Sequence, residues 1–145
     1  EALEDNIMLR QKLLHPHILE ALAGAGHGSR VLITDANYPA STMLGENAQL
    51  VYLNLAPGLV TVIDVLKVLT SVIPIEEAAV MEPAEGPEPE IFEEFRALLP
   101  GVPIVGYDRF QFYEEASGAD TCLQIVTGEQ RIYANLLLTI GVVMP

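Results

Sequence analysis

The chain has 145 residues, half of them hydrophobic, which suffices for one globular domain with a continuous core. Its 20 acidic and 7 basic residues give a net charge of −13 at pH 7. This charge excludes nucleic acids and anionic membrane surfaces as expected partners, because both are bound by clustered lysine and arginine. The longest apolar stretch, LLLTIGVVMP at the C-terminus, is about half as long as a bilayer span of roughly 20 residues.

The single cysteine, Cys122, excludes an intrachain disulfide and, with the lack of a recognisable signal peptide, predicts a cytoplasmic protein. It falls in the apolar run TCLQIV, where a buried strand residue is the favoured interpretation and a nucleophile the alternative. At the N-terminus, EALEDNI differs from the sequence that follows, and Met8 offers a plausible natural start. We therefore expect residues 1–7 to be a short extension and residues 8–145 to form the domain.

The spacing of apolar residues and the positions of glycine and proline predict ten elements. In chain order these are a helix from His15-Pro16 to the glycines of 24–28, strands over 30–34 and 49–55, a helix over 58–72, a strand over 77–83, a helix over 89–100, a strand over 103–107, a helix over 108–116, and strands over 121–127 and 132–143. Strands that alternate with helices indicate βαβ units, hence a single α/β domain with a largely parallel sheet flanked by helices. The last two strands are close enough in sequence to pair as a hairpin, which predicts a mixed sheet at one edge.

Residues 76–94 contain eight of the acidic residues, and no lysine or arginine occurs from Val68 to Phe95. The centre of this segment, PAEGPEPE, is rich in proline and carries charges of one sign. A solvated loop is the favoured interpretation, and an acidic docking surface for a basic partner is the alternative.

Several familiar catalytic patterns are absent. One cysteine and three histidines provide no structural zinc pattern, and we expect no metal. No Walker, GxGxxG or GxSxG motif occurs, and the glycine-rich AGAGHG precedes a strand, whereas a dinucleotide site needs it to follow one. The two histidines of HPH at 15–17 are expected to be surface or helix-capping residues.

Polar residues at the ends of strands remain as candidates, because α/β sheets bind their ligands there. His27 precedes the first strand and can equally be a turn residue, while Asp35 follows that strand and can equally accept an Asx-turn hydrogen bond. Arg109 begins a helix whose face it shares with Tyr113. Tyr133 and Asn135 are one residue apart and point the same way if their segment is extended.

At these residues the chain resembles the fucose mutarotase/D-ribose pyranase family (RbsD/FucU). HPHILEALAGAGHGSRVLITDANYP is similar to the N-terminal signature of the family, which places a glycine-flanked histidine before a strand and D-A-N-[FY]-P after it. TGEQRIYANLLLTIGVV is similar to its C-terminal signature, and the resemblance extends from Met8 to Val143. Two such motifs in the same order make a specific match.

The resemblance implies an isomerase that interconverts the anomers of a free sugar, or the pyranose and furanose forms of ribose, without a cofactor or metal. It also implies a ring-shaped homo-oligomer, often a decamer. It assigns the role of active-site histidine to His27 and that of acidic sugar contact to Asp35. Tyr133 and Asn135 match the sugar contacts near the C-terminus of the family.

The middle of the chain bears on the choice of sugar. DRFQFYEEA resembles the fucose-type R-F-x-F-Y, which makes Arg109 and Tyr113 sugar contacts, whereas the segment over 55–72 is closer to the ribose type and YAN replaces the YGN common in fucose enzymes. We favour a fucose-like sugar, because Arg109 and Tyr113 are the residues that would touch the ligand. A ribose pyranase and a non-catalytic sugar-binding or scaffold protein of the same fold are the alternatives.

The residue types suit acid–base ring opening, in which the ring oxygen gains a proton while the anomeric hydroxyl loses one. A histidine can deliver the first proton, and a tyrosine, Asp35 or water can accept the second. A strand of about five residues at ~3.3 Å each separates His27 from Asp35 by roughly 16 Å or more. The two residues are therefore too far apart to hold one small sugar unless the GHG loop folds back. The ring assembly that the resemblance implies suggests another solution, and we expect a site at a subunit boundary that is built from two chains.

Overall fold

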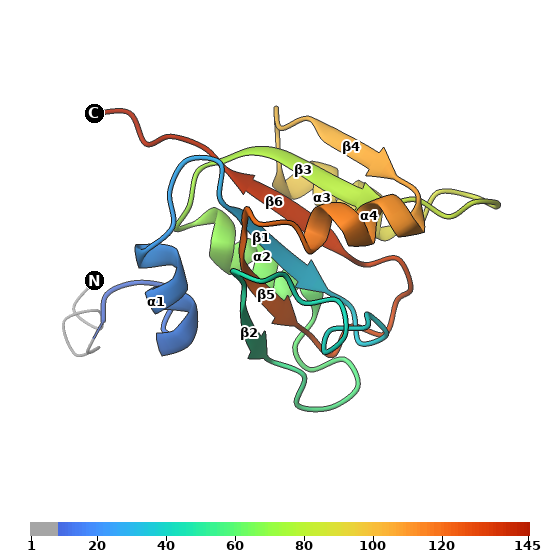
Figure 1. Ribbon diagram of the computed structural model, residues 1–145, viewed down its shortest axis with the longest axis horizontal. Helices are drawn as coiled ribbons and strands as arrows, with labels where there is room; N and C mark the ends of the chain where they lie inside the picture. Colours follow the sequence, from blue (N-terminus) through green and yellow to red (C-terminus); the bar gives the residue numbers. More distant parts are fainter. Residues whose placement is uncertain (1–8) are drawn as a thin grey trace.

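A computed structural model describes residues 9–145 as one α/β domain around a six-stranded sheet (Figure 1). The expectation for an N-terminal extension at 1–7 lies outside the described residues. The strands are β1 (Arg30–Thr34), β2 (Gln49–Tyr52), β3 (Ile75–Met81), β4 (Ile104–Tyr107), β5 (Thr121–Val126) and β6 (Leu136–Ile140). The helices are α1 (Pro16–Ala23), α2 (Val62–Thr70), α3 (Ile91–Leu98) and α4 (Arg109–Ala116).

The strand order in the sheet is β2-β5-β1-β6-β3-β4. The pairs β1/β5, β2/β5 and β3/β4 are parallel, so the predicted α/β class and largely parallel sheet are confirmed. The predicted hairpin is wrong, because β6 lies between β1 and β3 and runs antiparallel to both. Leu136, Leu137 and Leu138 are all buried, and a strand that is apolar on both faces is best covered at the centre of a sheet.

The two faces of the sheet pack against different helices, as alternation along β1 illustrates. Val31 and Ile33 belong to the larger core cluster, which also includes buried residues of α1, α2 and α3. Leu32 belongs to a smaller cluster on the other face, where Phe112 of α4 packs. Figure 1 shows α4 in front of the sheet and α3 behind it. Within residues 9–145, α4 is therefore the only helix on its face of the sheet.

Side chains fix the first turns of three helices. The Nδ1 atom of His15 accepts a hydrogen bond from the backbone N–H of Ile18, which confirms the capping role expected for this histidine. Thr61 and Asp64 form a reciprocal capping box on α2. The carboxylate of Asp108 accepts from the N–H of Gln111 at the start of α4.

The predicted helix over 58–72 begins later, at Val62, because the chain first makes a turn at Gly58 with φ of +79°. This turn passes so close to Gly128 that a Cβ atom there would lie 2.4 Å from the carbonyl oxygen of Ala56. The segment after β5 is thereby held against the segment after β2. Within residues 9–145, no helix has the length and apolar character needed to cross a membrane.

Candidate functional site

The carboxyl end of β1 meets the amino end of β6, because the two strands are antiparallel neighbours. Asp35 follows β1 and Asn135 precedes β6, and both side chains are buried. The backbone N–H of Asp35 donates to Oδ1 of Asn135 at 2.9 Å, and Nδ2 of Asn135 lies 3.4 Å from Oδ2 of Asp35. Two of the residues proposed from sequence, 100 positions apart, are thus in direct contact.

The carboxyl group of Asp35 also accepts a hydrogen bond from the backbone N–H of Asn37 at 3.0 Å. Asp35 therefore forms the Asx turn that was expected from the sequence as the alternative to a ligand contact. It also lines a pocket. Burial raises the pKa of Asp35 above its ordinary value, although hydrogen bonds from three backbone N–H groups and from Asn135 act in the opposite direction. Burial thus favours the protonated form of this carboxyl group.

Helix α4 places Arg109 and Tyr113 in the same pocket as Asp35. Nε of Arg109 donates to the hydroxyl oxygen of Tyr113 at 3.3 Å, and the guanidinium carbon lies 5.6 Å from the centre of the tyrosine ring. Phe112, the residue before Tyr113, is fully buried in the core cluster on this face of the sheet and fixes the orientation of the helix. The predicted shared face of Arg109 and Tyr113 is confirmed.

The final strand starts at Leu136 and not at the predicted 132, because residues 131–133 form a bend and a turn and residues 134–135 are irregular. Tyr133 has a φ of 58°, a left-handed backbone conformation in which the extended geometry expected for Tyr133 and Asn135 cannot form. Both side chains nevertheless reach the pocket. The turn is anchored by Arg131, which forms ion pairs with Glu94 and with the buried Glu129.

These residues surround a pocket of about 190 Å³, which we call the Asp35 pocket. It is smaller than the roughly 300–1,000 Å³ of pockets for drug-sized ligands, so it suits a small molecule. Five of the six residues proposed from sequence line it. The complete lining is Asp35, Asn37, Tyr38, Met81, Arg109, Tyr113, Ile132, Tyr133 and Asn135. The other four, Asn37, Tyr38, Met81 and Ile132, were not among the six, and only the positions of Asn37 and Tyr38 near Asp35 in DANYP offered a signal.

His27 is the sixth residue, and it lies at the other end of β1. The backbone N–H of its neighbour Gly28 donates to the carbonyl of Ile140 at the carboxyl end of β6. The imidazole is exposed, and its Nε2 lies 2.9 Å from Oε1 of Glu76. Within one chain, His27 and Asp35 are therefore not part of one pocket.

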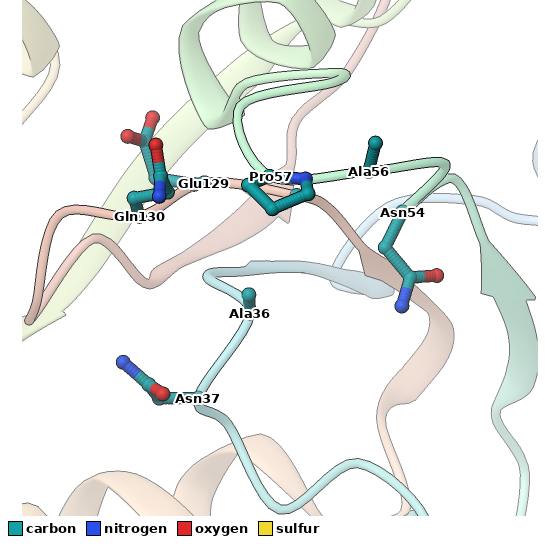
Figure 2. A pocket seen from close by; sticks show the side chains of 8 residues that line it. Ala36, Asn37, Asn54, Ala56, Pro57, Glu129 and Gln130 are labelled. Atoms are coloured by element: carbon teal, nitrogen blue, oxygen red, sulfur yellow. The ribbon is translucent and has the colours of Figure 1, made fainter.

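A second pocket, of about 430 Å³, shares Asn37 with the Asp35 pocket. Figure 2 shows the side chains that line this second pocket. The pocket follows the carboxyl ends of three parallel strands, with Asn54 after β2 and Gln130 after β5. The carboxylate of its charged residue, Glu129, already has protein partners, because it accepts a hydrogen bond from the N–H of Val62 and pairs with Arg131. The Asp35 pocket, with Arg109 and several titratable groups, is the stronger candidate.

Two other sequence features lie outside the Asp35 pocket. Cys122 is half-buried on β5, and burial raises the pKa of its thiol, which favours the structural interpretation over a nucleophile. The centre of the acidic segment, residues 83–90, is a largely exposed loop between β3 and α3, as expected, and its Glu88 pairs with Arg96 of α3. Among residues 9–145, no group of three or more histidine, cysteine, aspartate or glutamate side chains could hold a metal ion.

The Asp35 pocket therefore combines a carboxyl group, a carboxamide, a guanidinium and phenols in a volume suited to a small polar molecule. Together with the sheet order, this defines a small α/β protein with a polar pocket at one end of its central strands. The sequence model of the RbsD / FucU transport protein family matches residues 8–143. The chain belongs to this family, and the resemblance noted from the sequence is confirmed.

Solved structures give the same result. RbsD from Bacillus subtilis, complexed with D-ribose, has 26% sequence identity and a TM-score of 0.82, over 94% of this chain and 100% of that one. FucU from Bifidobacterium longum has 30% identity and a TM-score of 0.78, over 90% and 95%. The fucose mutarotase of Streptococcus pneumoniae, in complex with L-fucose, has 26% identity and a TM-score of 0.78, over 90% and 94%. The chain is thus similar to proteins of both the ribose and the fucose branch.

Proposed function

We propose that this chain interconverts the ring forms of a free monosaccharide by acid–base catalysis without a cofactor, and that L-fucose or a similar sugar is its substrate. The observation that carries this proposal is the convergence of Asp35, Arg109, Tyr113, Tyr133 and Asn135 on one small pocket. The sugar complexes of related RbsD and fucose mutarotase proteins support it.

In this proposal, hydrogen bonds to the sugar hydroxyls come from Asp35, Asn135 and Arg109. The rings of Tyr113 and Tyr133 provide apolar surfaces for the carbon face of the sugar. Asp35 is buried and its pKa is raised, which makes it a suitable group to exchange a proton with the anomeric hydroxyl. A modest acid–base contribution of roughly 10²–10⁴-fold is sufficient for a reaction that already proceeds in water.

The group that protonates the ring oxygen is His27 of a second copy of the chain. His27 and Asp35 occupy opposite ends of β1, so one chain cannot place both around one sugar. A homo-oligomer with the site at a subunit boundary solves this problem, and the family resemblance suggests a decameric ring. The cytoplasmic location inferred from the single cysteine stays a prediction.

The choice between fucose and ribose rests on Arg109 and Tyr113, which form a hydrogen-bonded pair at the pocket. A D-ribose pyranase is the second candidate, favoured by the TM-score of 0.82 with RbsD in complex with D-ribose. A binding protein without turnover is the third. All three share the pocket and differ in whether, and for which sugar, the ring forms exchange.

Magnetisation-transfer NMR distinguishes these candidates. L-fucose, D-ribose and D-galactose are each measured with and without the protein, and the exchange rate between ring forms is compared with buffer. We expect the rate for L-fucose to rise most, and Asp35→Asn to remove the increase. Faster exchange of D-ribose alone would show that the protein is a D-ribose pyranase. If the exchange of none of the three sugars is accelerated, the protein is not an enzyme for them.

A further inference from the structure

Tyr38 is a pocket residue that the proposed reaction does not use. It lies three residues after Asp35, and its side chain is only 7% exposed. Its ring packs edge-on against Phe112 and Tyr113, with centroid separations of 6.3 and 5.4 Å. These contacts hold Tyr38 in the wall of the Asp35 pocket.

The hydroxyl oxygen of Tyr38 is one of four buried side-chain atoms among residues 9–145 that lack a hydrogen-bond partner, and Tyr38 alone of their residues lines the Asp35 pocket. Proteins pair nearly all buried hydroxyl groups, since an unpaired one destabilises the fold. The titratable groups that act on this hydroxyl are Tyr113 and Asp35, and both line the same pocket. The unpaired group is therefore located among the residues proposed to bind the sugar.

The chemistry of the hydroxyl is that of a hydrogen-bond donor. Burial, with smaller contributions from Tyr113 and Asp35, raises the pKa of Tyr38 well above its ordinary value of 10.0. The phenol therefore stays protonated at physiological pH and is not a base. A phenylalanine would make the same ring contacts without an unpaired hydroxyl, so packing does not account for a tyrosine at this position.

We infer that Tyr38 is a further substrate-binding residue, whose hydroxyl forms a hydrogen bond with one hydroxyl group of the sugar in the Asp35 pocket. The inference rests on the proposed function, because it takes the ligand to be a polyhydroxylated molecule. A group that is unpaired in the free protein and paired in the complex contributes to affinity and not to folding. Removal of the hydroxyl should therefore weaken sugar binding without lowering the stability of the free protein.

The test compares Tyr38→Phe with the wild type in the full chain. Dissociation constants for L-fucose, D-ribose and D-galactose are measured by NMR titration, and thermal unfolding is followed in the absence of sugar. We expect the unfolding midpoint of Tyr38→Phe to equal or exceed that of the wild type. The dissociation constant of the best-bound sugar should rise about fivefold to a hundredfold, as for loss of a buried hydrogen bond.

Tyr52→Phe is the matched control, because Tyr52 lies on β2, is 56% exposed and does not line the pocket. Tyr52→Phe should change neither the unfolding midpoint nor the dissociation constant for sugar. Monodeoxy derivatives of the best-bound sugar then identify the partner hydroxyl. For one derivative the wild type and Tyr38→Phe should bind equally, while the other derivatives keep the difference, as in a double-mutant cycle.

Three results would overturn the inference. Equal sugar affinity of Tyr38→Phe and the wild type would reject it and leave the proposed function intact. A lower unfolding midpoint of Tyr38→Phe would show that the hydroxyl has a structural role. A wild type that binds none of the three sugars and accelerates none of their exchange reactions would reject both the inference and the proposed function.

Discussion

Two buried carboxyl groups beside the pocket are stabilised by different kinds of partner. Asp35 is held by backbone N–H groups and by Asn135, and burial leaves its pKa raised. Glu129 is held by Arg131 and by the N–H of Val62 at the start of α2. Burial is the largest single influence and acts to raise the pKa of Glu129 as well, but the hydrogen bonds and charge of Arg131 and the hydrogen bond from Val62 together outweigh it, so that this pKa is lowered. The two groups are therefore expected to have opposite effects on stability as the pH changes.

For Asp35, a pKa that is higher in the folded than in the unfolded state gives stability at low pH. This contribution is fully present below the ordinary value of 3.8 and is lost as the pH rises through the folded-state pKa. We expect the free energy of unfolding of the wild type, minus that of Asp35→Asn, to fall as the pH rises from 3.5 to 7. Chemical denaturation at several pH values measures this difference, and a difference that increases with pH would contradict the raised pKa.

For Glu129, a lowered pKa gives stability that is present above the ordinary value of 4.5 and lost as the pH falls through the folded-state pKa. Glu129→Gln removes the ion pair with Arg131, whose side chain is partly exposed, and weakens the contact with Val62. We expect it to lower the free energy of unfolding by about 1–2 kcal/mol at pH 7. The loss should shrink at acid pH, and Glu114→Gln, at an exposed position of α4, should show neither effect.

At the scale of elements, α4 carries two candidate sugar contacts in its first and second turns. Its start depends on Asp108, whose carboxylate accepts from the N–H of Gln111 at 2.8 Å. We expect Asp108→Ala to lower the free energy of unfolding by about 0.5–2 kcal/mol, as for other N-cap losses. Sugar affinity should fall with it, because Arg109 immediately follows the cap. Asp108→Ser, which can still cap, is the control. Unchanged sugar affinity of Asp108→Ala would show that sugar binding does not depend on the cap of α4.

The elements also show how far local sequence patterns determine this fold. All ten predicted helices and strands exist, because their apolar spacing and their glycine and proline boundaries are local properties. The position of β6 was not predictable in this way, since which strands become neighbours depends on packing across the whole sheet. The turn at Tyr133 was missed because a left-handed tyrosine has no signature in the sequence. Five of the nine pocket residues were found through the motifs, whereas the unpaired hydroxyl of Tyr38 required coordinates.

At the scale of the whole molecule, β1 separates two groups that the proposed reaction needs together. His27 lies beside Glu76 at one end of β1, and Asp35 contacts Asn135 at the other. A rigid central strand, paired on both sides by β5 and β6, cannot bend to bring its ends together. The proposed reaction therefore predicts that a second chain completes the site, and subunit mixing tests this prediction directly.

We expect His27→Gln and Asp35→Asn to be inactive separately and to recover activity when coexpressed. If each site takes His27 from one chain and Asp35 from the next, random mixing restores both groups in about a quarter of the sites. Sites contained in single chains would remain inactive at every mixing ratio, since each chain lacks one group. The exchange rate of L-fucose, measured on oligomers purified through tags on both chains, distinguishes the two arrangements. Coexpression of two differently tagged His27→Gln chains is the control, and activity in it would show that His27 is dispensable.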